Sequence, residues 1–213
     1  MKTAAVHGRC LNINEENAVS KFAENLRCCI SEEEGKTDSL SFICIGSDRA
    51  TGDSLGPVVG HMLSRKIQNC NVKIYGSLSK PVHAINITDT LGRIYSENKN
   101  TLIIAVDAAL SKYPDRVGVV SIGAGAVRPG AFAGKALPPV GHIYITGVVN
   151  WASRLNDIEI LQSTRLGLVM KMAEIITGGI YLTVCKRSRI SEFQHRDLQR
   201  NQTVLQSDKR VFE

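Results

Sequence analysis

Two short and almost wholly apolar runs constrain the fold of this chain more than any other feature. They read LSFICI at Leu40–Ile45 and TLIIAV at Thr101–Val106. Apolar runs of this length that are rich in branched side chains are typical of strands buried on both faces of a parallel sheet. We therefore expect two inner strands, with Thr101–Val106 at the centre of the sheet.

The segments around these runs alternate between helix and strand patterns. The expected helices cover 16–30, 54–69 and 84–98, and the expected further strands cover 72–75, 117–122 and 143–145. One long closing helix is expected from apolar residues on one face, namely Ile158, Leu161, Leu168, Met172 and Ile175. Strands that alternate with helices indicate a layered α/β domain.

Size and composition suit one domain with its own core. The chain has 213 residues, of which 43% are hydrophobic and 22% are charged, as in ordinary soluble proteins. We expect a single α/β domain over residues 1–185 and a basic, polar tail over 186–213. The tail is expected to be either disordered or ordered only on a partner.

Several classes of protein are not expected. The sequence shows neither an unbroken apolar run of the roughly 20 residues that span a bilayer nor a secretory signal. The six cysteines include no CxxC pair, which argues against a zinc site, and reduced thiols are the simpler interpretation. Much of the net charge of +6 lies in the tail, which is more typical of a solvated chain end than of a nucleic-acid surface. We expect a cytoplasmic protein without membrane, nucleic-acid or cofactor partners, and a homo-oligomer is left open.

The loop after the first apolar run carries the residues on which function depends. It reads GSDRATGDSLGP from Gly46 to Pro57. A phosphate-binding loop would need a Lys where Asp53 stands, and a carboxylate there repels phosphate, so this interpretation fails.

The same loop matches the G-x-S-x-G pattern of serine hydrolases, with Ser54 as the nucleophile. Such a serine sits directly on the turn between strand and helix, yet the apolar run ends near Gly46. None of the five histidines follows an Asp by three residues, as the GDSL esterases require. The serine interpretation is weakened but stays open.

A third interpretation makes Asp53 react together with Asp107, which follows Thr101–Val106. Ligands of open α/β sheets bind beyond the carboxyl ends of strands, where the strand order switches. If the two apolar strands are neighbours, both carboxylates point into one crevice. Either aspartate alone is equally well explained as a helix or turn cap, but their joint placement favours a site.

These residues resemble the signature of a small sporulation protein family described as spore-protease-like. That family is similar to the germination protease, which degrades small acid-soluble spore proteins. Asp53 falls on the first catalytic aspartate of that protease, and Val106–Leu110 matches the segment that holds the second, at Asp107. Arg128–Lys135 and Pro81–Ala84 provide supporting matches.

The resemblance implies a three-layer α/β/α sandwich with a mostly parallel or mixed sheet, as in the hydrogenase-maturation endopeptidases. Those enzymes use two carboxylates and a His to grip nickel in their substrate, and His142 is a positional candidate for the third group. Two departures separate this chain from the germination protease: Gly52 stands in place of a proline, and the extra segments of that enzyme are missing.

We therefore expect an endopeptidase of the aspartate-dyad type, in the forespore or spore cytoplasm, that cleaves a protein or peptide substrate such as small acid-soluble spore proteins. Asp53 and Asp107 are expected to be catalytic without a bound metal, and the backbone amides of Ser54 and Leu55 to stabilise the oxyanion. The residues expected to contact substrate are Gly46, Ser47, Asp48, Ser54, Gly56, His83, Gly130 and His142. A catalytically silent sporulation binding factor and a serine hydrolase are the alternatives.

Overall fold

A six-stranded sheet in the order β1-β5-β6-β4-β2-β3 forms the middle of the molecule. The computed structural model describes residues 8–33, 37, 39–67, 72–129, 137–151 and 156–185. Its strands are β1 (Arg9–Asn12), β2 (Ser39–Cys44), β3 (Val72–Tyr75), β4 (Thr101–Ser111), β5 (Val119–Ala124) and β6 (Ile143–Trp151). Its helices are α1 (Ala18–Ser31), α2 (Leu55–Lys66), α3 (Ile87–Glu97) and α4 (Asp157–Gln162), the single turns η1 (Gly52–Ser54) and η2 (Pro114–Arg116), and a long helix described over Leu166–Cys185.

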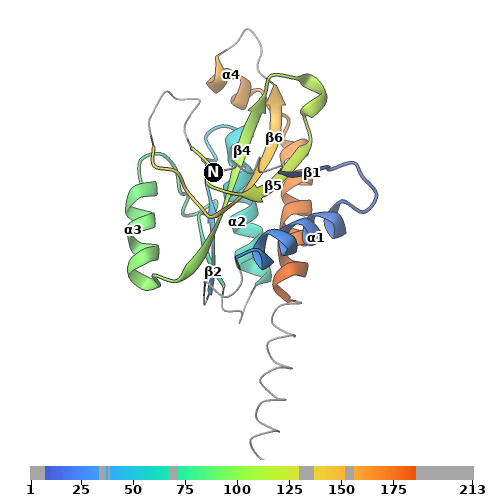
Figure 1. Ribbon diagram of the computed structural model, residues 1–213. Helices are drawn as coiled ribbons and strands as arrows, with labels where there is room; N and C mark the ends of the chain where they lie inside the picture. Colours follow the sequence, from blue (N-terminus) through green and yellow to red (C-terminus); the bar gives the residue numbers. More distant parts are fainter. Residues whose placement is uncertain are drawn as a thin grey trace, which may run out of the picture.

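Helices cover both faces of this sheet (Figure 1). Helix α3 packs on one face, whereas α1, α2 and the helix Leu166–Cys185 pack on the other. Strands β6, β4, β2 and β3 are parallel, and β5 runs antiparallel to both of its neighbours, β1 and β6. The expected three-layer α/β/α fold with a mixed sheet is confirmed. The tail over 186–213 lies outside the described residues.

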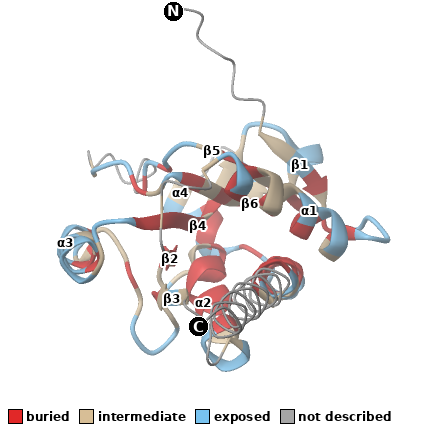
Figure 2. Cartoon of the chain, turned by 60° about the horizontal axis from the view of Figure 1, so that its bottom comes forward, coloured by how far each residue is buried: buried red, intermediate tan, exposed pale blue. Residues whose placement is uncertain are grey.

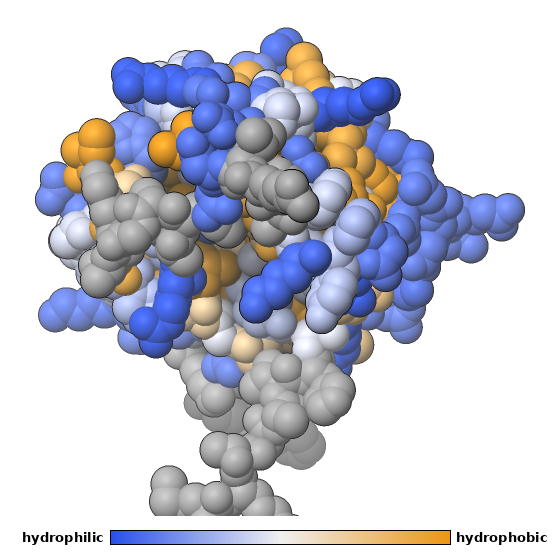
Figure 3. Space-filling model, turned by 90° about the horizontal axis from the view of Figure 1, so that it is seen from above, coloured by the Kyte–Doolittle hydropathy of each residue, from blue (hydrophilic) through white to orange (hydrophobic). Residues whose placement is uncertain are grey.

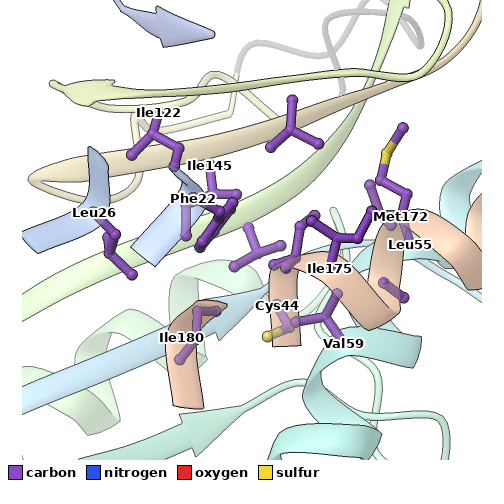
Figure 4. Packing of buried hydrophobic residues seen from close by; sticks show 14 of the residues in the cluster. Phe22, Leu26, Cys44, Leu55, Val59, Ile122, Ile145, Met172, Ile175 and Ile180 are labelled. Atoms are coloured by element: carbon purple, nitrogen blue, oxygen red, sulfur yellow. The ribbon is translucent and has the colours of Figure 1, made fainter. Parts of the chain in front are cut away.

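Most of the core lies between the sheet and the layer of three helices. Its side chains include Phe22 and Leu26 of α1, Leu55 and Val59 of α2, and Met172 and Ile180 of the long helix (Figure 4). The faces of α2 and the long helix that turn toward the sheet are buried (Figure 2). Residues Leu102–Val106 of β4 are each at most 1% exposed, which confirms that this strand is central.

The structure corrects the expectations for strand lengths. Strand β1 was not predicted, and it extends the sheet by pairing with β5. Strands β4 and β6 run on to Ser111 and Trp151 because they pair with each other beyond the end of β2. The apolar pattern of Thr101–Val106 therefore marks only the part of β4 that pairs with β2.

The single closing helix that was expected is two helices. Helix α4 begins at a capping box, in which the Asn156 side chain accepts the Glu159 amide and the Glu159 side chain accepts the Asn156 amide. It ends at Gln162, because the carbonyl of Ile160 accepts hydrogen bonds from the side chains of Asn150 and Thr164. Ile158 therefore belongs to a separate short helix and is exposed rather than part of a buried face.

By length and composition alone, the helix Leu166–Cys185 could cross a bilayer. The sequence analysis did not indicate this, because polar residues interrupt the apolar residues of this segment. Within its most apolar window 56% of the residues are buried. Met172, Ile176 and Ile180 of this helix lie in the core against the sheet. Core packing accounts for its apolar character.

Gly56 lets the start of α2 lie directly against β2 and its loop. A Cβ atom at this position would collide with the backbone carbonyl of Ile45. We expect Gly56→Ala to lower the free energy of unfolding by about 1–3 kcal/mol, the usual cost of overpacking. Gly92→Ala in α3 is the matched control, because its Cβ would meet no atom within 4 Å, and it should raise stability by up to about 1 kcal/mol. Urea unfolding measures both, and equal effects would contradict the packing argument.

Candidate active site

The strand order switches between β2 and β4. The two strands pair in parallel, with Cys44 opposite Val106 as the last pair. From β2 the chain continues to β3 on one side, whereas β4 leads to β5 and β6 on the other side. A crevice forms at such a switch because the two connections diverge from neighbouring strand ends. The two carboxylates were expected to share one crevice if the two apolar strands are neighbours. The pairing of β2 with β4 shows that they are.

Asp107 is the first residue of β4 beyond its pairing with β2. It pairs only with Thr146 of β6, and the amide of Ile45 donates to the carbonyl of Val106 just before it. Side chains alternate along a strand, so Asp107 lies on the face that carries Ile103 and Ala105. The carboxyl group is partly buried, and its Oδ1 accepts the Ala108 amide at 2.9 Å. Asp107 is thus a strand residue and not the turn cap that was the alternative interpretation.

Asp53 lies in η1, on a loop that folds back over the end of β2. The amide of Gly46 donates to the carbonyl of Val82 at 2.8 Å, and the amide of Ser47 donates to the carbonyl of Asp53 at 3.1 Å. Gly46 has φ of +138°, and a Cβ there would collide with the carbonyl of Asp53, so a side chain at this position is excluded. The close turn at Gly46 brings Asp53 back toward the end of the strand.

Asp53 and Asp107 line one cavity of about 260 Å³. Other residues around it include Ile45, Gly46, Ser47, His83, Pro129 and Leu161. It lies beyond the end of β2 and against α4. Figure 3 shows that hydrophobic residues form separate patches within a hydrophilic surface on the upper face of the molecule. The cavity is lined mostly by apolar groups around two carboxyl groups.

Burial raises the pKa values of both aspartates, and the charge of Asp53 also raises that of Asp107. Burial, and after it the charge of Asp53, raise the pKa of Asp107 to about 8, although the hydrogen bond from the Ala108 amide opposes the shift. Burial also raises the pKa of Asp53, while the Ser47 amide and His83 lower it. Two close carboxyl groups titrate as a pair. Because the charge of Asp53 raises the pKa of Asp107, Asp53 is the first of the two to ionise, and Asp107 keeps its proton at neutral pH.

His83 contributes a polar group on the wall opposite β4. Its Nδ1 accepts the amide of Ile85 at 3.3 Å, so the neutral ring carries its proton on Nε2. The preceding residue, Val82, forms a bridge with Ile45 and so attaches this segment to the sheet. His83 lines the cavity and favours the ionised form of Asp53.

A family model described as "Protein of unknown function (DUF1256)" matches residues 10–179, a segment that includes Asp53, His83 and Asp107. This chain belongs to the DUF1256 family. It is 47% identical over 141 residues to the "Uncharacterized protein YyaC" of Bacillus subtilis (strain 168), covering 66% of this chain and 67% of that relative. Among solved structures, the NiFe hydrogenase maturation protease HycI from Thermococcus kodakarensis KOD1 aligns with a TM-score of 0.40 and 19% identity, over 71% of this chain and 97% of that one.

The structure of this DUF1256 chain argues against Ser54 as a nucleophile. The residue is only 6% exposed, its Oγ donates to the carbonyl of Thr51 at 2.6 Å, and it does not line the cavity. Its amide also donates to the carbonyl of Thr51, so this amide is not free to stabilise an oxyanion as expected. Ser54 closes the η1 turn that carries Asp53.

His142 lies away from the two aspartates. It precedes β6, its Nδ1 accepts the amide of Ile103 at 3.0 Å, and it does not line the cavity. Ile103 is four residues before Asp107 on β4, a separation of about 13 Å along an extended strand. The expected role of His142 at the site is not supported, because β6 starts near the opposite end of the sheet. Within the described ranges, no three His, Cys, Asp or Glu side chains come together as metal ligands.

The other residues that were expected to contact substrate lie in different places. Gly46 and Ser47 line the cavity, whereas Asp48 lines an adjoining one of about 560 Å³. Gly56 lies beneath the loop against Ile45 and acts through packing. Gly130 lies outside the described residues.

Sequence reasoning missed the apolar residues that close the cavity, Ile158 and Leu161 of α4 and Pro129. The pattern Asn156–Glu159 is a capping box and was a signal for the start of a separate helix. No local pattern shows that this helix lies over the ends of β2 and β4.

Proposed function

We propose that this DUF1256 chain is a peptidase in which Asp53 and Asp107 hydrolyse peptide bonds of a protein or peptide substrate. One observation carries the proposal: the two carboxyl groups line one cavity at the switch point, with burial and the charge of Asp53 raising the pKa of Asp107 to about 8. Such a pair supplies a base and an acid together at neutral pH.

The roles follow from where the proton is held. The Asp53 carboxylate takes a proton from water as the water oxygen attacks the scissile carbonyl carbon. Asp107 donates its proton to the leaving amine as the carbon–nitrogen bond breaks. The proton on Asp53 then passes to Asp107, which restores the starting state. Each transfer contributes about 10²–10⁴-fold to the rate in comparable enzymes.

We assign the oxyanion contact to His83 in place of the Ser54 amide, which donates to the carbonyl of Thr51. Its Nε2–H is available because Nδ1 already accepts the amide of Ile85. The ring lies in the same cavity as both carboxyl groups. We assign His83 to donate a hydrogen bond to the carbonyl oxygen as negative charge develops there.

The proposal extends to the substrate of this peptidase and to the cell compartment in which it acts. The resemblance of the Gly46–Pro57 loop to the germination protease makes small acid-soluble spore proteins the first substrate to test, in the forespore or spore cytoplasm. Purified protein is incubated with these proteins, and mass spectrometry locates the cuts. Cuts at defined bonds support the proposal. Tight association without any cut favours the catalytically silent binding factor instead.

Ser54→Ala separates the aspartate and serine mechanisms. We expect cleavage to change by no more than about threefold, because the substitution removes one hydrogen bond to Thr51 and no reacting group. A fluorophosphonate probe should leave the wild-type protein unlabelled. Loss of cleavage in Ser54→Ala, together with labelling of the wild type at Ser54, would establish a serine hydrolase and refute the aspartate pair.

A further inference from the structure

The cavity that holds Asp53 continues into a second cavity with an apolar rim. This second cavity has a volume of about 560 Å³ and shares several lining residues with the first, among them Ser47, His83 and Ile158. It is therefore the direct continuation of the space around the two carboxyl groups, not a separate surface feature.

Two of the most exposed isoleucines of the described chain face this second cavity. Ile85 is 84% exposed and Ile158 is 59% exposed, and they come from the segment before α3 and from α4. Single exposed apolar side chains are common on protein surfaces. Here two exposed isoleucines from separate elements line one cavity, beside the small apolar residues Pro81 and Ala84. Together they form an apolar surface that an apolar group of a ligand would cover.

The charges at this rim do not select a charged ligand. Asp48 and Arg49 both line the second cavity and carry opposite charges, so their net charge is zero. An extended peptide also has space to continue past Asp107, because that residue lines a third cavity of about 280 Å³, bounded by small residues such as Ala108, Ala109 and Ala126.

We propose that the second cavity is a specificity subsite that takes a bulky apolar side chain of the substrate, such as Leu, Ile, Phe or Met, close to the scissile bond. This inference deepens the proposed peptidase function and rests on it. Ile85 and Ile158 are the specificity-determining residues, because each loses exposed apolar surface when such a side chain enters.

The test measures binding separately from cleavage. The probes are end-blocked, fluorescein-labelled decapeptides of Ser, Gly, Asn and Thr, in which a single Leu is moved through the positions, together with the all-polar parent. Binding is measured by fluorescence polarisation on the Asp107→Asn protein, which should not cut them. We expect the best Leu peptides to bind at least about tenfold more tightly than the parent, as for one apolar group in a pocket.

Ile85→Ser and Ile158→Ser, made together in the Asp107→Asn protein, should remove this preference. Leu166→Ser is the matched control, since Leu166 is 58% exposed and lines neither cavity, and it should keep the preference. Thermal unfolding shows that each variant is folded. The inference is overturned if the Leu peptides do not bind, or if the all-polar parent binds as tightly as they do. It is also overturned if the preference for Leu survives the double substitution.

Wild-type protein incubated with the same peptides distinguishes this inference from the peptidase proposal. A Leu preference that depends on the two isoleucines, without any cut by the wild type, supports the apolar subsite and refutes the peptidase. Cuts that do not depend on the position of Leu support the peptidase and refute the subsite.

Discussion

Asp53→Asn and Asp107→Asn should each reduce kcat/KM for peptide cleavage by at least about 10³-fold, because each substitution removes one member of an acid–base pair. Asn has nearly the shape of Asp and can still accept the hydrogen bond from the Ala108 amide, so the cavity should persist. The double variant should be no worse than the worse single variant, since the two groups act as a unit. Quantitative mass spectrometry of cut peptides measures the loss.

Asp115→Asn is the control for this experiment. Asp115 lies in η2, is exposed and lines none of the three cavities near the aspartates, so cleavage should stay within a few-fold of the wild type. In the wild type, cleavage should fall as pH rises through about 8, because Asp107 then loses its proton. Full activity in either single variant, or an equal loss in Asp115→Asn, would refute the assignment of the pair.

Asp107→Asn should also make the protein more stable at pH 7. Burial and the charge of Asp53 raise the pKa of Asp107 from 3.8 to about 8. The folded state therefore binds a proton that the unfolded state has released, and stability is lost as pH rises from about 4 to about 8. A neutral Asn avoids this loss, and the gain at pH 7 is up to about 4 kcal/mol, because one pKa unit corresponds to about 1.4 kcal/mol.

Urea unfolding at pH 4, 7 and 9 measures this gain. The difference between Asp107→Asn and the wild type should be small at pH 4, large at pH 7, and constant above about pH 8. Asp53→Asn provides the matched control, since removing its charge lowers the pKa of Asp107 and weakens the pH dependence of stability. Identical pH dependence in all three proteins would mean that Asp107 lies in a water-like environment, and the mechanism would then lose its acid.

The two inner strands were predictable because each is an apolar run bounded by polar loops. The bounds of β2 differ from the prediction by one residue at each end, and the exposure of Leu102–Val106 matches a strand buried on both faces. The extension of β4 to Ser111 was not predictable, since Asp107 interrupts the apolar pattern. Beyond the end of β2, β4 continues by pairing with β6 alone. The local sequence does not show which of its two neighbouring strands continues beside it.

The two histidines illustrate the same limit at the site. Both stand in loops beside predicted strands, and position alone favoured His142 for a third group beside the carboxylates. The structure places His83 in the cavity, whereas the Nδ1 of His142 accepts the amide of Ile103 near the start of β4. The difference follows from strand direction: β4 and β6 are parallel, so a residue before β6 lies at the amino ends, away from Asp107.

By itself the sequence determined the α/β class, the central strand and the loop that carries Asp53, and it singled out the two aspartates and His83 as candidates, because each depends on patterns within a few residues. Only the tertiary structure decided that β2 and β4 are neighbours, that His83 lines the same cavity as both carboxyl groups and that α4 lies at this cavity. These features depend on segments about 25–100 residues apart in the chain, and strand pairing and packing of the complete sheet bring them together.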